Sequence, residues 1–129
     1  MKPISSTLLL RWPVAFILIM HSIPGMLDNG VNDFGNLYLN KIGFAPFGLV
    51  IAWAIKLSHV AAAVCLVIDK YVKWAAVVTI FILVMGIFMV HAPNGWFVAG
   101  RGTNGVEFNF ILIFVLLYLG FPGIIRTSR

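Results

Sequence analysis

The chain has 129 residues, of which 61% are hydrophobic and only 10% are charged. An ordinary soluble domain is about 45–50% apolar and about one quarter charged. A soluble domain this short cannot bury so much apolar surface, because its surface-to-volume ratio is too high. The composition therefore excludes a water-soluble enzyme, a disordered tail and a nucleic-acid reader, and it predicts one integral membrane domain.

Four apolar segments each have about the 20 residues that a helix needs to cross a bilayer. They cover about residues 7–27, 45–68, 72–91 and 105–121. Only a helix satisfies the backbone amides within such a segment, and no alternating barrel pattern is present. The start of the chain resembles a signal peptide, but Arg11 interrupts its apolar run and no cleavage site follows. The sequence predicts an all-α, four-helix membrane bundle that keeps its first helix.

Basic residues set the orientation of these helices. The side that holds both termini and the turn after the second helix collects Lys2, Arg11, Lys70, Lys73, Arg126 and Arg129. The other side collects only Lys41 and Arg101. This asymmetry predicts that both termini lie in the cytoplasm. Arg11, near the cytoplasmic end of the first helix, is expected to anchor that helix at the interface.

The two outer loops carry most of the turn residues. Residues 28–30 end the first helix, and Asp33 is expected to cap a short interfacial helix with an apolar face over residues 37–42. The second outer loop spells GxGxxG over residues 100–105. That pattern marks a dinucleotide site only between a strand and a helix, so we interpret its glycines as a turn into the fourth helix.

Ionisable side chains inside the apolar spans are the candidate site, because each costs roughly 2.5–3.5 kcal/mol at mid-bilayer. Lys56 lies near the middle of the second helix, and His59 follows at i+3 on the same face. Small residues, including Gly48, Ala52 and Ala63, extend this face, which predicts that it packs on other helices and not on lipid. The alternative is a Lys56 side chain that snorkels to the interface.

Three further ionisable residues fall in the outer half of the other helices. His21 lies at a depth close to that of Lys56, His91 closes the third helix and Glu107 opens the fourth. We expect these groups to converge in one enclosed polar site, with Glu107 as the counter-ion for Lys56. The alternatives are a packing role for His21 and a Glu107 that only stabilises the start of its helix. Ring contacts to a ligand are expected from Trp96, Phe97, Phe108 and Tyr118.

The histidines give little support for a metal or a haem. His21 and His59 differ in depth by about 8 Å at 1.5 Å per residue, and the three histidines lack HxxxH or HxxE spacing. Cys65 is the one cysteine, so the chain alone can form neither a disulfide nor a CxxC pair. We expect no metal, no intrinsic cofactor and, because no basic stripe is present, no nucleic-acid partner.

Several short runs resemble the DoxX family of small bacterial and archaeal membrane proteins. They are Arg11 and His21, residues 42–46 (Ile-Gly-Phe-Ala-Pro), residues 91–97 (His-x-x-Asn-Gly-x-Phe) and the Gly-x-Glu start at residues 105–107. The resemblance covers about residues 8–123, and His59 stands where the family usually has a glutamate. It implies a multi-pass protein of the bacterial cytoplasmic (inner) membrane. It also implies a link to quinones, because the family includes the membrane subunit of thiosulfate:quinone oxidoreductase.

Three functions are open at this point. The first is a quinone-linked subunit or partner of a membrane oxidoreductase, in which His91 donates to the quinone, Glu107 relays a proton and Lys56 stabilises negative charge. A redox partner protein would then supply the electron carrier. The second is a binding or transport module for a small anion or a proton, which with four helices implies a homo-oligomer or a larger complex. The third is a structural membrane anchor without catalysis.

Overall fold

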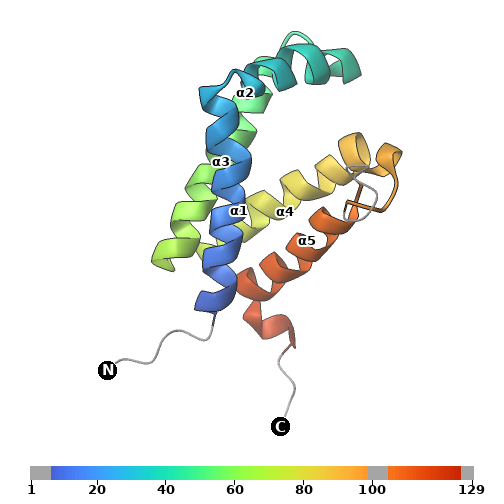
Figure 1. Ribbon diagram of the computed structural model, residues 1–129. Helices are drawn as coiled ribbons and strands as arrows, with labels where there is room; N and C mark the ends of the chain where they lie inside the picture. The colour runs from blue at the N-terminus through green and yellow to red at the C-terminus, as the bar shows by residue number, and fades with distance from the viewer. Residues whose placement is uncertain (1–6, 99–104, 126–129) are drawn as a thin grey trace. The chain divides into compact units, whose positions relative to one another are not determined.

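The structure is a computed structural model that describes residues 7–98 and 105–125. In these residues it is all-α, with five α-helices and shorter π and 3-10 segments between them (Figure 1). By internal packing the chain divides into two units. We call Arg11–Lys70 the N-terminal unit, and Tyr71–Arg129 together with Met1–Leu10 the C-terminal unit.

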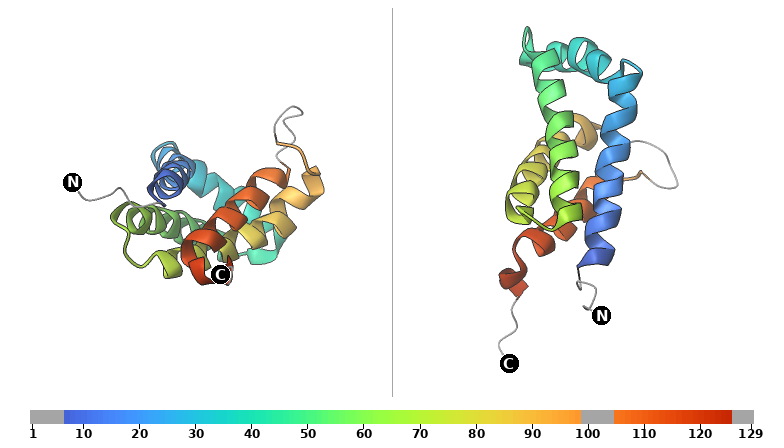
Figure 2. Two further views of the ribbon diagram at one scale, coloured as in Figure 1. Left: turned by 90° about the horizontal axis from the view of Figure 1, so that it is seen from below. Right: turned by 90° about the vertical axis from the view of Figure 1, so that its left-hand side faces the viewer.

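Four helical elements make up most of the N-terminal unit: α1 (Leu8–Leu27), α2 (Gly30–Asp33), the π-helix η1 (Phe34–Phe44) and α3 (Gly48–Ile68). Helices α1 and α3 run antiparallel, and α2 and η1 cross from the end of one to the start of the other (Figure 2). The predicted first and second spans are therefore confirmed as helices. Their large apolar side chains, such as Phe16 and Val50, are largely exposed, as expected for helices that face lipid.

The loop between α1 and α3 is helical, as expected, but Asp33 does not cap it. Asp33 lies in the last turn of α2 with helical φ and ψ, and it makes no capping hydrogen bond. The turn is formed earlier, where Asn29 adopts a left-handed conformation (φ 72°) and the Gly30 N–H donates to Asp28 Oδ1 at 3.0 Å. The predicted cap is wrong because α2 begins three residues before Asp33 and runs on into η1.

Two glycines bring η1 and α3 together at backbone distance. A Cβ atom on Gly35 would lie 2.6 Å from Leu49 Cα, and one on Gly48 would overlap the Gly35 carbonyl oxygen. The Asn40 side chain then accepts a hydrogen bond from the Gly48 N–H at 2.9 Å, which satisfies an otherwise free amide at the start of α3. The core beneath this contact contains Val31, Leu39 and Ala52. The backbones of η1 and α3 are therefore in direct contact at Gly35 and Gly48.

The C-terminal unit contains α4 (Val72–Gly86), η2 (Ile87–His91), η3 (Ala92–Asn94), α5 (Glu107–Gly120) and η4 (Pro122–Ile125). Helices α4 and α5 pack side by side along their lengths (Figures 1 and 2). At one end their contact is close, since a Cβ on Gly120 would lie 2.5 Å from Ala76 Cβ. The third predicted span is confirmed to His91, and the chain then leaves the helix at Gly95 (φ 85°).

Within the described residues, three helical stretches are long and apolar enough to cross a membrane: Leu8–Leu27, Gly48–Ile68 and Val72–Asn94. The fourth predicted span is shorter than expected, because α5 has 14 residues, or about 21 Å against a hydrocarbon core of about 30 Å. Helix α5 stops at Gly120, two residues before Pro122. The predictions that rest on Lys2, Arg101, Arg126, Arg129 and residues 100–104 lie outside the described residues.

Candidate functional site in the N-terminal unit

The buried face of α3 carries an unpartnered histidine. His59 is 6% exposed, and neither ring nitrogen has a hydrogen-bond partner among the described residues. Gly48, Ala52 and Ala63 are buried on the same helix, so the prediction that this stripe packs within the protein is confirmed. A buried polar group without a partner is unusual, because its desolvation is then uncompensated. His59 is therefore the first residue at which a ligand would be expected.

Lys56 lies one turn from His59 and is half-buried. Its Nζ atom lies 6.0 Å from the centroid of the Phe34 ring, which belongs to η1. This distance is at the outer limit of a cation–π interaction. The ammonium group is thus directed toward the outer end of the unit, which favours the snorkelling alternative while leaving Lys56 beside the histidine.

His21 joins this group from α1. Its side chain is exposed, and it interacts electrostatically with His59, as Lys56 does. Three of the five predicted site residues, His21, Lys56 and His59, therefore lie together in the N-terminal unit. His91 and Glu107 belong to the C-terminal unit. The convergence of all five residues and the Lys56–Glu107 pair stay predictions.

A residue that the sequence analysis missed is the neighbour of His21. Ser22 is fully buried, and its Oγ atom has no hydrogen-bond partner among the described residues. Its burial stripe on α1 also contains Leu18, Ala15 and Arg11. A serine inside an apolar span is a weak signal on its own, because its hydroxyl usually bonds to the carbonyl of the preceding turn. Here that bond is absent, which only the structure could show.

An apolar groove of about 430 Å³ runs between α1 and α3. It is lined by Trp12, Ala15, Phe16, Ile19, Ala63, Val64, Val67 and Ile68. Phe16 and Ile68 are more than half exposed, so the groove is open along its side toward the surrounding medium. In a bilayer, a groove of this kind is accessible laterally from the lipid. It suits a slender apolar chain rather than a polar solute.

The groove lining ends at Ile19 on α1 and at Ala63 on α3, and the unpartnered side chains lie three and four residues beyond it. Ser22 lies seven residues from Ala15 and His59 lies four residues from Ala63, so each shares a helix face with a groove-lining alanine. The apolar groove and the two buried polar groups therefore lie next to each other along α1 and α3, inside one unit of the fold.

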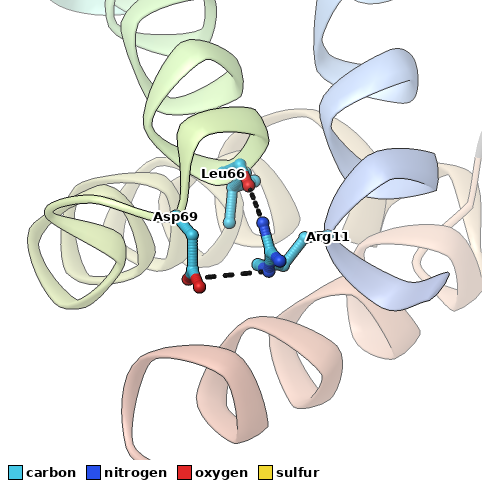
Figure 3. A network of polar contacts seen from close by, with 3 residues as sticks. All are labelled: Arg11, Leu66 and Asp69. Carbon is cyan, nitrogen blue, oxygen red and sulfur yellow. Dashed lines mark hydrogen bonds and ion pairs between the residues drawn. The ribbon is translucent and has the colours of Figure 1, made fainter. Parts of the chain in front are cut away.

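Arg11 closes the opposite end of α1 and α3. Its side chain is 4% exposed, its Nη1 donates to the Leu66 carbonyl at 2.6 Å, and its Nε lies 3.6 Å from Asp69 Oδ1 (Figure 3). Arg11 therefore contacts α3 within the protein, which the sequence did not predict, and its anchoring at the interface stays a prediction. The guanidinium is used inside the protein because Leu66 is in the last turn of α3, where carbonyl groups lack helical partners.

Residues of the C-terminal unit and the family of the chain

Glu107 serves the start of its own helix. Its Oε1 accepts a hydrogen bond from the Val98 N–H at 2.6 Å, and its own N–H donates to the Trp96 carbonyl at 2.9 Å. These contacts favour the alternative in which Glu107 stabilises the N-terminus of α5. A small hollow of about 350 Å³ lies beside it, lined by Val98, Glu107, Phe108 and Ile111.

The predicted ring residues have different surroundings. The Trp96 ring packs edge-on against Phe110, with ring centroids 5.3 Å apart. Phe97 is exposed, and Phe108 lines the hollow next to Glu107. Tyr118 is 42% exposed and lies three turns along α5 from Glu107. Among these rings, Phe108 is the one placed beside the carboxylate.

Asn109 is a second polar residue that the sequence analysis missed. It is buried on α5, and its Nδ2 donates to the Leu83 carbonyl of α4 at 3.3 Å. A Cβ on Gly86 would lie 3.4 Å from the same Nδ2 atom and 3.8 Å from His91 Cδ2. Asn109 therefore joins α5 to α4 close to His91. Its position as a polar residue within a predicted apolar span is the feature of the sequence that could have identified it.

Two variants of Glu107 distinguish whether its side chain acts as a hydrogen-bond acceptor at the start of α5 or through its negative charge. Glu107→Ala is expected to lower the free energy of unfolding by about 1–2 kcal/mol, because the Val98 amide loses its acceptor. Glu107→Gln keeps an acceptor oxygen and is expected to stay within about 0.5 kcal/mol of the native protein. Chemical unfolding in detergent, followed by circular dichroism, measures both. An equal loss in the two variants would contradict the capping role.

Metal binding finds no support in the part of the chain that the structure describes. Within residues 7–98 and 105–125, no group of three His, Cys, Asp or Glu side chains could hold a metal ion. The polar groups of the N-terminal unit are better suited to hydrogen bonding than to coordination.

Three long apolar helices, most of whose large apolar side chains face outward, define the class of this chain as a multi-pass membrane protein. A comparison with known families matches the DoxX family over residues 6–92, which is well over half of the chain. The chain therefore belongs to the DoxX family. No curated protein and no solved structure matches it. The matched region contains the whole of the N-terminal unit and ends one residue after His91.

Proposed function

We propose that the chain is a quinone-binding subunit of a membrane oxidoreductase, with its site in the N-terminal unit. The single observation that carries the proposal is His59, a buried histidine without a partner among the described residues, which lies four residues along α3 from Ala63 in the lining of a laterally open apolar groove. A membrane quinone has the matching parts: carbonyl oxygens that accept hydrogen bonds and a long apolar tail. The tail would lie along Phe16 and Val64, and the head would reach His59.

Each residue near the head has a stated task in this proposal. His59 donates an N–H to a carbonyl oxygen, and its second ring nitrogen can hold a proton. Lys56 stabilises negative charge that develops on the head during reduction. Conversion of a quinone to a quinol takes up two electrons and two protons, and a redox partner protein of the same membrane supplies the electrons. In this proposal the head lies near the middle of the second span, close to Lys56 and His59.

The topology that we infer is four spans with both termini in the cytoplasm of a bacterial cell. Helix α5 is short, and a short span is accommodated by local thinning of the bilayer or by snorkelling residues at its ends. Lys70 and Lys73 flank the turn between the second and third helices, and the positive-inside rule assigns this turn to the cytoplasmic side.

Binding of quinone analogues tests the proposal. The native protein in nanodiscs is titrated with decylubiquinone and with a short-chain menaquinone, and tryptophan quenching is recorded, because Trp12 lines the groove. His59→Leu is expected to weaken binding about tenfold, since a buried hydrogen bond to the head is lost. His91→Leu, a histidine variant in the C-terminal unit, is the matched control and is expected to bind as the native protein does. No saturable binding of either analogue by the native protein would refute the proposal.

A second candidate function is supported by the charge of the same site. His21, Lys56 and His59 all bear positive charge when protonated. The carboxylates of the N-terminal unit are Asp28, Asp33 and Asp69, which lie outside the two long spans. Such a site also suits a small anion. Anion uptake into liposomes that falls on Lys56→Ala would favour this function. Transport by a chain of four helices implies a homo-oligomer. A structural anchor without a ligand instead predicts that neither Lys56→Ala nor His59→Leu changes anion uptake or quinone binding.

A further inference from the structure

We propose that Ser22 and His59 hold one acceptor oxygen of the head group between them, one from each long helix of the N-terminal unit. The inference rests on the proposed function, because it names the second residue of the same site and the class of oxygen that it binds. Both side chains are more than nine-tenths buried, and neither has a hydrogen-bond partner among the described residues. A single bound ligand would account for both buried, unpartnered side chains in this unit.

The two side chains lie beyond the same end of the groove. Ser22 follows Ile19 by three residues, or about 4.5 Å along α1. His59 precedes Ala63 by four residues, or about 6 Å along α3. Ile19 and Ala63 are the groove-lining residues farthest from the Arg11 end, and α1 and α3 are antiparallel. Ser22 and His59 are therefore at the same end of the groove, each within about 6 Å of its lining along the helix axis.

The chemistry of the pair selects one kind of ligand atom. A serine hydroxyl and a neutral imidazole each provide one polar hydrogen, and a carbonyl oxygen has two lone pairs to accept them. Binding one carbonyl oxygen would satisfy both buried groups at once and would remove the desolvation cost that each now carries. A hydrocarbon in the groove satisfies neither. The site is thus specific for an amphipathic molecule whose apolar tail ends in a carbonyl-bearing head.

The position of the oxygen also links the two helices. At the Arg11 end, α1 and α3 are joined by the Arg11 hydrogen bond to Leu66 and its ion pair with Asp69. At the Ser22 end, a ligand oxygen shared by Ser22 and His59 would join the two helices as well. We therefore expect a bound quinone to raise the melting temperature of the native protein.

Serine variants test the pair directly. Ser22→Ala is expected to weaken decylubiquinone binding about tenfold. Ser58→Ala is the matched control, because Ser58 lies in the same unit and its hydroxyl already donates to the Ile55 carbonyl at 2.6 Å. It is expected to bind as the native protein does. Decylbenzene, which has a similar tail and no oxygen, serves as the probe for packing alone, and Ser22→Ala should leave its affinity unchanged.

The double variant gives the sharpest result. If Ser22 and His59 bind the same oxygen, Ser22→Ala with His59→Leu should lose much less affinity than the product of the two single losses. Full additivity would overturn the shared oxygen, and so would an equal Ser22→Ala effect on decylbenzene. Unchanged quinone affinity in Ser22→Ala alongside a loss in His59→Leu would overturn this inference and leave the proposed function standing. Absence of quinone binding in the native protein would refute both.

Discussion

Arg11→Ala is expected to lower the free energy of unfolding by about 3 kcal/mol. The substitution leaves a cavity at a position that is 4% exposed, and it removes the donor that binds the Leu66 carbonyl. Loss of the Arg11 side chain should also weaken the contact between the ends of α1 and α3, which are drawn in Figure 3. Unfolding of the purified protein in mixed micelles, followed by far-ultraviolet circular dichroism, measures the change.

Two further variants divide this effect into its parts. Arg11→Met fills most of the volume of the arginine side chain but has no hydrogen-bond donor. Its loss of stability therefore measures the contribution of the polar contacts of Arg11 apart from packing. Asp69→Asn removes the charge and keeps a residue that tolerates the left-handed conformation of position 69 (φ 58°). Its cost is expected to be about 1 kcal/mol or less, because the Asp69 side chain is 54% exposed. A native-like stability of Arg11→Ala would instead support the anchoring role that the sequence predicts.

Gly35→Ala and Gly48→Ala are each expected to destabilise the protein by about 3 kcal/mol. Helix propensity alone predicts the opposite sign, because alanine is favoured over glycine in a helix by about 1 kcal/mol. The close approach of η1 and α3 overrides propensity here. A Cβ on Gly35 meets Leu49 Cα and the Gly48 backbone, and neither can move aside without shifting a helix.

Glycines without a backbone contact below 3.4 Å provide the controls for this prediction. Gly123→Ala meets nothing within 4 Å, and Gly25→Ala meets Val31 Cγ2 at 3.3 Å and the Val31 nitrogen at 3.7 Å. Both are expected to change stability by less than about 1 kcal/mol. The double variant of Gly35 and Gly48 should be less destabilised than the sum of the single variants, because both alanines disturb one contact. Stabilisation by either single substitution would show that η1 and α3 are not held at backbone distance.

Much of the fold could be predicted from the sequence because membrane helices follow local rules. Backbone groups in hydrocarbon must be satisfied within each segment, so an apolar run of sufficient length predicts a helix wherever it occurs. The first three spans and the interfacial segment follow from this. The length of α5 does not, because the start of this helix depends on the contacts of Glu107 with Trp96 and Val98.

The candidate site could be predicted only in part. A charged or imidazole side chain within an apolar span is visible in the sequence, and this identified Lys56 and His59. Arg11 was visible too, but its role was not, because the partner that decides it is a backbone carbonyl 55 residues away. Ser22 carried almost no signal, since a serine in a helix usually bonds to its own backbone.

The sequence by itself determined that this chain lies in a membrane, about where its first three long helices lie, and which costly side chains those helices carry. These properties depend on composition and on bonds within one segment. Only the tertiary structure decided which polar groups have partners and where the apolar surface is hollowed. A hydrogen bond between two helices depends on their distance and rotation, and no pattern within either helix contains that information.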